Sequence, residues 1–233
     1  GQAIATIAAR EGAAVVIGDV DDEGAAVADR IKNTGGRAVF KRTDVTKADD
    51  IHALVRAAKD AFGPADIAFA NAGIEGPVGA PWDCKESDFA RVIDINLIGA
   101  WRTMAAVLPG MVERKKGSIV VTSSAAGLVG AGGLAAYVAS KHGLVGLMRS
   151  AAVDTAKLGV RINAICPGVI ATSMVERLGA AVPNFEEALL AMKPMGRLGA
   201  PNEAAEAAIW LASDKASFVT GAALSVDGGY AAQ

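Results

Sequence analysis

A serine, a tyrosine and a lysine in one stretch of this chain are residue types that can transfer a proton at an alcohol or carbonyl oxygen. Ser124 follows the apolar run Ile119–Val121, and Tyr137 and Lys141 stand four residues apart. A free phenol has a pKa of about 10, which a nearby ammonium group lowers by favouring the phenolate. The three residues are therefore candidates for general acid–base catalysis, with Ser124 bonded to the reacting oxygen. The alternative is a structural pair, a lysine stem packed along a half-buried tyrosine.

The surrounding pattern predicts a buried strand, a loop of small residues and a helix. Ile119, Val120 and Val121 form a short apolar, β-branched run, which is typical of a strand covered on both faces. Residues 135–158 have a helical pattern that would place Tyr137 and Lys141 on one face, one turn apart. The loop 123–127 then lies where the strand ends and opens into a crevice.

Strand-like and helix-like segments alternate along the chain. We expect strands at 14–18, 37–42, 66–70, 118–122 and 161–165, and helices at 2–9, 23–31, 49–62, 86–113 with a bend at Pro109, and 135–158. Repeated strand–helix units with right-handed crossovers predict an α/β fold, a doubly wound parallel sheet (Rossmann-type) with ligands at the carboxyl ends of its strands. Residues 1–233 are expected to form a single domain.

The alternation is interrupted between Pro167 and Pro201, where prolines, glycines and methionines gather. A long insertion at the binding edge of an α/β sheet is often a substrate lid, which we expect at about 167–201. The alternative is an ordinary connection.

Composition limits the classes of function. The chain is 52% hydrophobic and 21% charged with a net charge of -2, which argues against a nucleic-acid surface. No uninterrupted apolar stretch reaches the ~20 residues of a membrane span, and the first residues do not look like a signal peptide. Cys84 and Cys166 are expected to be free thiols in a reducing, cytoplasmic compartment. His52 and His142 do not have metal-site spacing.

Asp19 ends the first predicted strand, where an acidic residue of a dinucleotide fold binds the ribose hydroxyls and repels a 2′-phosphate. Because no arginine follows it directly, we expect NAD rather than NADP; the alternative is a cap on the next helix. Gly1 has the spacing of the last glycine in a phosphate-binding turn. No strand and no earlier glycines stand before it. We therefore expect a preceding segment that this sequence lacks, and a gap at the centre of the sheet.

Together these motifs resemble the short-chain dehydrogenase/reductase family along the whole chain except its front. Ser124, Tyr137 and Lys141 match the family's catalytic serine and Tyr-x-x-x-Lys in order and spacing, and Asn96 matches the asparagine of its catalytic tetrad. The cofactor-binding positions that the resemblance implies are Gly1, Asp19, Asp44, Val45, Asn71, Ala72, Gly73, Tyr137, Lys141, Pro167, Gly168, Ile170 and Thr172.

The resemblance implies hydride transfer between NAD and a secondary alcohol or ketone, with Tyr137 as general base in oxidation and general acid in reduction. Lys141 would lower the pKa of Tyr137, and Asn96 would hold a water on the proton path. A homotetramer paired through helices 86–113 and 135–158 is also implied. The small apolar run 128–134 favours a small, largely uncharged substrate. A 3-oxoacyl-thioester reductase, a sugar dehydrogenase and, in another class, a non-catalytic dinucleotide-binding scaffold remain open.

Overall fold

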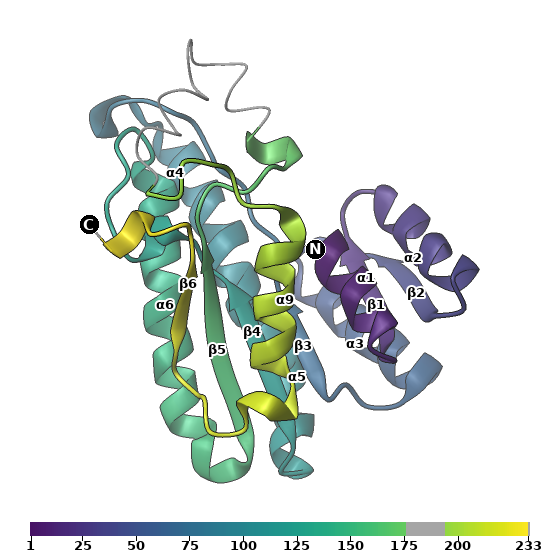
Figure 1. The fold of residues 1–233 in the computed structure, drawn as a ribbon. Helices are drawn as coiled ribbons and strands as arrows, with labels where there is room; N and C mark the ends of the chain where they lie inside the picture. Colours follow the sequence, from purple (N-terminus) through teal and green to yellow (C-terminus); the bar gives the residue numbers. More distant parts are fainter. Residues whose placement is uncertain (176–193, 233) are drawn as a thin grey trace.

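Parallel strands with helices between them form the protein in its computed structural model, which describes residues 1–175 and 194–232 (Figure 1). The strands are β1 (Ala14–Asp19), β2 (Arg37–Arg42), β3 (Ile67–Ala70), β4 (Gly117–Thr122), β5 (Val160–Pro167) and β6 (Ala223–Val226). Neighbouring strands pair in parallel, in the orders β1-β2 and β3-β4-β5-β6. This arrangement confirms the predicted α/β fold.

Helices connect the strands, and one of them, α3, shows clearly how the sequence sets its ends. They are α1 (Gln2–Arg10), α2 (Glu23–Asn33), α3 (Ala48–Phe62), α4 (Glu86–Ile93), α5 (Gly99–Glu113), α6 (Ala135–Thr155) and α9 (Pro201–Ala212). In α3, Asp49 and Asp50 lie in the first turn, where carboxylates interact favourably with the helix dipole. Gly63 ends α3 at a φ of 92°, a conformation that favours glycine, and Pro64 follows.

Helices cover both faces of β4, which explains its uninterrupted apolar sequence. Ile119 and Val121 belong to a core cluster with α5 and α6, whereas Val120 belongs to a second cluster with α1 and α9. All three side chains are fully buried, and each contributes about 1.5–3 kcal/mol to folding relative to an exposed position. The carboxyl end of β4 therefore opens between two helical layers.

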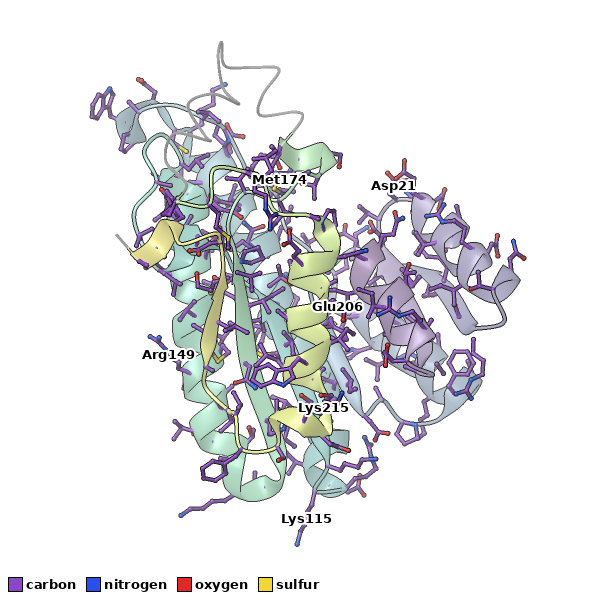
Figure 2. The ribbon with its side chains drawn as sticks, viewed as in Figure 1. Asp21, Lys115, Arg149, Met174, Glu206 and Lys215 are labelled. Atoms are coloured by element: carbon purple, nitrogen blue, oxygen red, sulfur yellow. The ribbon has the colours of Figure 1, made fainter. Side chains whose placement is uncertain are left out.

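The sheet is divided between β1 and β3, which do not pair with each other in the described residues. This division agrees with the gap that the sequence predicts at the centre of the sheet. Helix packing joins the two parts instead: Ile7 of α1 and Ala208 of α9 share a core cluster, and Arg10 Nη2 lies 2.9 Å from Glu206 Oε1. Figure 2 shows Glu206 on the side of α9 towards α1.

The long helical run Glu86–Glu113 changes its geometry in the middle. A π turn, η2 (Asp94–Ile98), joins α4 to α5, while Pro109, the expected bend, lies inside α5. By length and mean hydropathy this run could cross a membrane, which the search for an uninterrupted apolar stretch does not reveal. Core helices of soluble proteins pass the same test, and Val92 and Met104 of this run are buried.

Candidate active site

Ser124 and Tyr137 meet at the carboxyl end of β4, where the short helix η3 (Ala125–Gly127) turns the chain towards α6. Ser124 Oγ accepts a hydrogen bond from the backbone N–H of Ala126 at 3.1 Å, which fixes the serine at the start of this turn. Tyr137 lies in the first turn of α6, and its phenol forms a hydrogen bond with the Ser124 side chain. The two hydroxyl groups can therefore face one substrate oxygen.

Lys141 lies one turn after Tyr137 and is only 3% exposed. Its Nζ donates a hydrogen bond to the backbone oxygen of Thr122 at 2.8 Å and lies 5.5 Å from the centre of the Tyr137 ring. Burial of the ammonium group lowers the pKa of Lys141 to about 8, an effect that the charge of Cys166 opposes. The amine is therefore mostly protonated at neutral pH.

The pKa of Tyr137 is raised, whereas the sequence led us to expect it lowered by Lys141. Burial of the phenol is the largest cause; the hydrogen bond with Ser124 lowers the pKa, and the charge of Glu75 raises it. Lys141 is not among the groups that shift it, and its amine is bonded to the carbonyl of Thr122. The four-residue spacing predicts the neighbour correctly, but burial determines the direction of the shift.

Asn96 is fully buried in the π turn and holds the loop after β3. Its Oδ1 accepts from the N–H of Ile74 at 2.8 Å, and its Nδ2 donates to the Ile74 carbonyl at 2.9 Å and to Ser140 Oγ at 3.0 Å. Gly73 lies where a Cβ would come within 3.2 Å of Asn96 Oδ1 and 3.3 Å of Lys141 Nζ. Asn96 and Lys141 therefore flank the same glycine.

Four expected cofactor residues lie at the carboxyl ends of β1 and β3 and at the start of α1. Asn71 Oδ1 accepts a hydrogen bond from Thr122 Oγ1 at 3.1 Å, which ties β3 to β4. A Cβ at Gly1, where α1 begins, would lie 3.2 Å from Asn71 Nδ2. Asp19 ends β1 and is exposed, as is Ala72. The N-terminus of α1 and these polar groups share one edge of the protein.

Asp44 and Val45 lie in the loop after β2, where contacts within the protein hold them. Asp44 Oδ1 accepts from the N–H and the hydroxyl of Thr46 at 3.0 and 2.7 Å, and these bonds lower the pKa of Asp44. Val45 packs so closely on the π-turn end of α5 that a Cβ at Gly99 would lie 2.8 Å from Val45 Cγ2. Arg102 Nη1 donates to the Val45 carbonyl at 3.3 Å, so the loop is fixed against the helix that carries Asn96.

The residues expected near the nicotinamide are Pro167, Gly168, Ile170 and Thr172. Pro167 ends β5, and a Cβ at Gly168 would lie 2.7 Å from Asp227 Cα, so the close approach requires glycine there. Ile170 forms a β-bridge with Gly199, and the exposed Thr172 bonds the Ile170 carbonyl. The predicted lid at 167–201 lies largely outside the described residues, since 176–193 are not described.

The structure adds two charged residues that the sequence analysis missed. Glu75 acts electrostatically on Tyr137; its place directly after the Asn-Ala-Gly-Ile stretch was the available signal. Arg42 is the register partner of Asp19 in the β1–β2 pair, and its Nη1 lies 3.0 Å from Asp22 Oδ1. The arginine is distant in sequence, and only parallel pairing of the two predicted strands would have revealed it.

Among the described residues, no three His, Cys, Asp or Glu side chains group as metal ligands.

Comparison with known proteins gives consistent matches over the whole chain. A family model described as Enoyl-(Acyl carrier protein) reductase matches residues 1–231. The chain is 42% identical to a 2,5-dichloro-2,5-cyclohexadiene-1,4-diol dehydrogenase of Sphingobium indicum and 44% identical to a cis-4-hydroxycyclohexanecarboxylate dehydrogenase of Sinomonas cyclohexanicum; each match covers 100% of this chain and 92% of the relative. The crystal structure of levodione reductase superposes with a TM-score of 0.94 at 35% identity, covering 100% of this chain and 93% of the other.

Proposed function

This chain belongs to the short-chain dehydrogenase/reductase family, and we propose that it transfers a hydride between NAD and a small, uncharged secondary alcohol or ketone. Dehydrogenases of this family act on alcohol groups with nicotinamide cofactors. The observation that carries the proposal is the meeting of Ser124, Tyr137 and Lys141 at the carboxyl end of β4.

The residues present fit a dinucleotide. Gly1 is the N-cap of α1 and makes no side-chain cap, so the first amides of the helix can bind a phosphate. The Asp19 carboxylate can accept from ribose hydroxyls and would repel a 2′-phosphate. Arg42, which could otherwise attract that phosphate, is paired with Asp22. These contacts support NAD over NADP.

The protein's own groups manage the proton and the position of the substrate. When bound, the nicotinamide would exchange the hydride, and its oxidised, cationic ring would favour the phenolate. Tyr137 accepts the alcohol proton in oxidation and donates it in reduction, while Ser124 Oγ holds the substrate oxygen. The buried ammonium group of Lys141 supplies a positive charge beside the phenol. Asn96 fixes Ile74 and Ser140 around them.

The substrate class follows from the loop at 128–134 and from the relatives. Gly130 and Gly132 have no atom within 4 Å of a Cβ position, and Gly133 approaches Val78. Met174 adds an apolar side chain above the carboxyl ends of the strands (Figure 2). Two relatives act, by their names, on hydroxyl groups of six-membered rings, which supports a cyclic secondary alcohol as the substrate.

The test is a spectrophotometric assay of the purified protein over a panel of secondary alcohols and ketones with NAD and with NADP. We expect activity on small cyclic alcohols, at least about tenfold higher kcat/KM with NAD, and a loss of 10³-fold or more in Tyr137→Phe, which keeps the ring but removes the proton carrier. Sugars and a 3-oxoacyl thioester in the panel test the alternative substrates. Dinucleotide binding without turnover, unchanged by Tyr137→Phe, would establish the scaffold instead.

A further inference from the structure

Ser140 is a fully buried serine in the helical turn of α6 that carries Tyr137 and Lys141. Its Oγ donates a hydrogen bond to the backbone carbonyl of Tyr137 at 2.7 Å and accepts one from Asn96 Nδ2 at 3.0 Å. A carbonyl can only accept and an amide nitrogen can only donate, so the direction of both bonds is fixed. The serine hydroxyl therefore serves two partners at once.

This hydroxyl connects the π turn η2 to the backbone of Tyr137. The N–H of Ile74 donates to Asn96 Oδ1 at 2.8 Å, which leaves Nδ2 of the same amide to face Ser140. The carbonyl of Tyr137 also belongs to the helix, where its regular partner is the N–H of Lys141. A continuous chain of hydrogen bonds thus runs from the loop after β3 through Asn96 and Ser140 to Tyr137.

Helix preference does not explain a serine at position 140. Serine is less favourable than alanine inside a helix, and a side chain that bonds a carbonyl of the preceding turn slightly destabilises the helix. Positions 135, 136 and 139 of the same helix carry alanine. The advantage of the hydroxyl therefore comes from its partner on another element, the buried Asn96.

The next residue ties the same turn to a different element. Lys141 Nζ donates to the carbonyl of Thr122, at the end of β4, at 2.8 Å. Consecutive residues therefore fix this turn of α6 both to η2 and to β4. The position of the Tyr137 backbone between these two attachments determines where its phenol lies.

We propose that Ser140 is a positioning residue, whose hydroxyl holds the backbone of Tyr137 against Asn96 and so aligns the phenol with the substrate oxygen. This inference rests on the proposed function and adds a residue to it. Because Ser140 is fully buried, its side chain is out of reach of substrate and cofactor. Its loss should therefore affect the alignment of the reacting groups and not the binding of either reactant.

Steady-state kinetics with NAD and the cyclic alcohol that turns over fastest in the panel test the proposal. We expect Ser140→Ala to lower kcat about tenfold and to change KM for either reactant less than about twofold, because small misplacements slow the chemical step. Ser140→Cys keeps a weak donor and acceptor in a similar volume, and its kcat should lie between those of the serine and alanine proteins. It is also the second variant should Ser140→Ala fail to fold.

Thr155→Val is the matched control for the loss of a buried hydroxyl. Thr155 lies in the last turn of the same helix, and its Oγ1 bonds the carbonyls of Ala151 and Val160 at 2.9 and 3.1 Å. Valine keeps the volume and removes the hydroxyl, so the substitution lowers stability, but kcat should stay within about twofold of the unaltered protein. An equal loss of kcat in Thr155→Val and Ser140→Ala would assign the effect to stability and overturn the proposal.

A double-mutant cycle tests the path through Asn96. If the hydroxyl acts by way of this amide, Ser140→Ala should lower kcat less than about twofold further in a protein that already carries Asn96→Ala. Independent roles would instead multiply the two losses. A multiplied loss overturns the path through Asn96.

Amide hydrogen exchange measures the same connection without turnover and without cofactor. In Ser140→Ala the Asn96 amide loses one of its partners, and the N–H of Ile74 is bonded to the other end of that amide. The peptide that contains Ile74 should then exchange at least about threefold faster, although Ile74 is bonded to Asn96 and not to Ser140. Thr155→Val should leave this exchange unchanged.

The outcomes separate this proposal from the proposed function. Unchanged kcat in a folded Ser140→Ala protein, or a raised KM with unchanged kcat, overturns the positioning role while the dehydrogenase activity stands. Absence of turnover with every alcohol in the unaltered protein overturns the proposed function. The exchange of Ile74 then still decides whether Ser140 holds Asn96 in place, and an unchanged exchange rate in Ser140→Ala overturns that connection.

Discussion

At the scale of single residues, the buried ammonium group of Lys141 places a positive charge beside Tyr137 and lowers the stability of the folded protein. Its pKa falls from the ordinary 10.5 to about 8 because the ammonium group is buried, a difference equivalent to about 3 kcal/mol. Below pH 8 the Lys141 amine is protonated in both the folded and the unfolded state. The full cost of burying its charge therefore lowers the stability of the folded state. Between about pH 8 and 10.5 the folded state loses its proton first, and stability rises with pH.

Lys141→Met should therefore stabilise the protein at pH 7 while abolishing turnover. Methionine fills a similar volume without a charge, and we expect the free energy of unfolding to rise by about 1–3 kcal/mol, since the lost bond to Thr122 offsets part of the gain. Urea unfolding at pH 7 and above pH 10 measures the free energy of unfolding of both proteins. The stability gained by Lys141→Met should be smaller at the higher pH. Lys157→Met is the control, because Lys157 is exposed; a stability gain that is independent of pH would contradict the explanation.

The sequence predicts the identity of the site residues better than their electrostatic state. The Tyr-x-x-x-Lys spacing fixes which side chains are neighbours, because helix geometry places residues four apart on one face. The pKa of Tyr137 depends instead on what covers the phenol, and the covering groups come from distant segments such as the loop of Glu75. Long-range packing of this kind leaves no local pattern.

At the scale of elements, the π turn η2 holds the loop that follows β3. Asn96→Ala would leave both backbone groups of Ile74 and the Ser140 hydroxyl without this partner. We expect a loss of about 2–4 kcal/mol in the free energy of unfolding, because buried polar groups without partners are costly. We also expect kcat to fall, since Gly73 and Lys141 border the same side chain.

Chemical denaturation and steady-state kinetics on the same preparations test this prediction. Asn33→Ala makes the same substitution at an exposed position near the end of α2, and should cost less than about 0.5 kcal/mol. If Asn96→Ala lost no more stability than Asn33→Ala, the π turn would not be what holds the loop.

Periodicity in the sequence predicts the positions of most strands and helices. Glycine, proline and charged residues help to predict where they end. The strand at 37–42 agrees with β2 at both ends. The exceptions have physical reasons. A π turn differs from an α-helix by a single hydrogen-bond step and does not change the apolar period enough to be seen. Strand β6 spans only Ala223–Val226 before a pair of glycines, too short for an alternating pattern.

At the scale of the whole molecule, α5 and α6 each leave one large apolar side chain exposed. Trp101 is 52% exposed and Val153 is 79% exposed. Gly146 lies mid-helix with no atom within 4 Å of a Cβ position, although glycine there costs about 1 kcal/mol relative to alanine. Gly146, Arg149 and Val153 recur at helical spacing on one side of α6, and Figure 2 shows Arg149 pointing away from the sheet. A glycine with open space suits close approach by another helix.

We therefore propose that this face is the interface of the homotetramer that the family resemblance implies, and that Val153→Glu dissociates it. In an interface related by twofold symmetry each substitution occurs in both subunits, so two carboxylates enter one apolar contact. Light scattering after size-exclusion chromatography should then report a smaller assembly. Val20→Glu is the control, because Val20 is 54% exposed in the turn between β1 and α2, and it should leave the mass unchanged. A Val153→Glu protein with the mass of the unaltered assembly would place the subunit contact on another face.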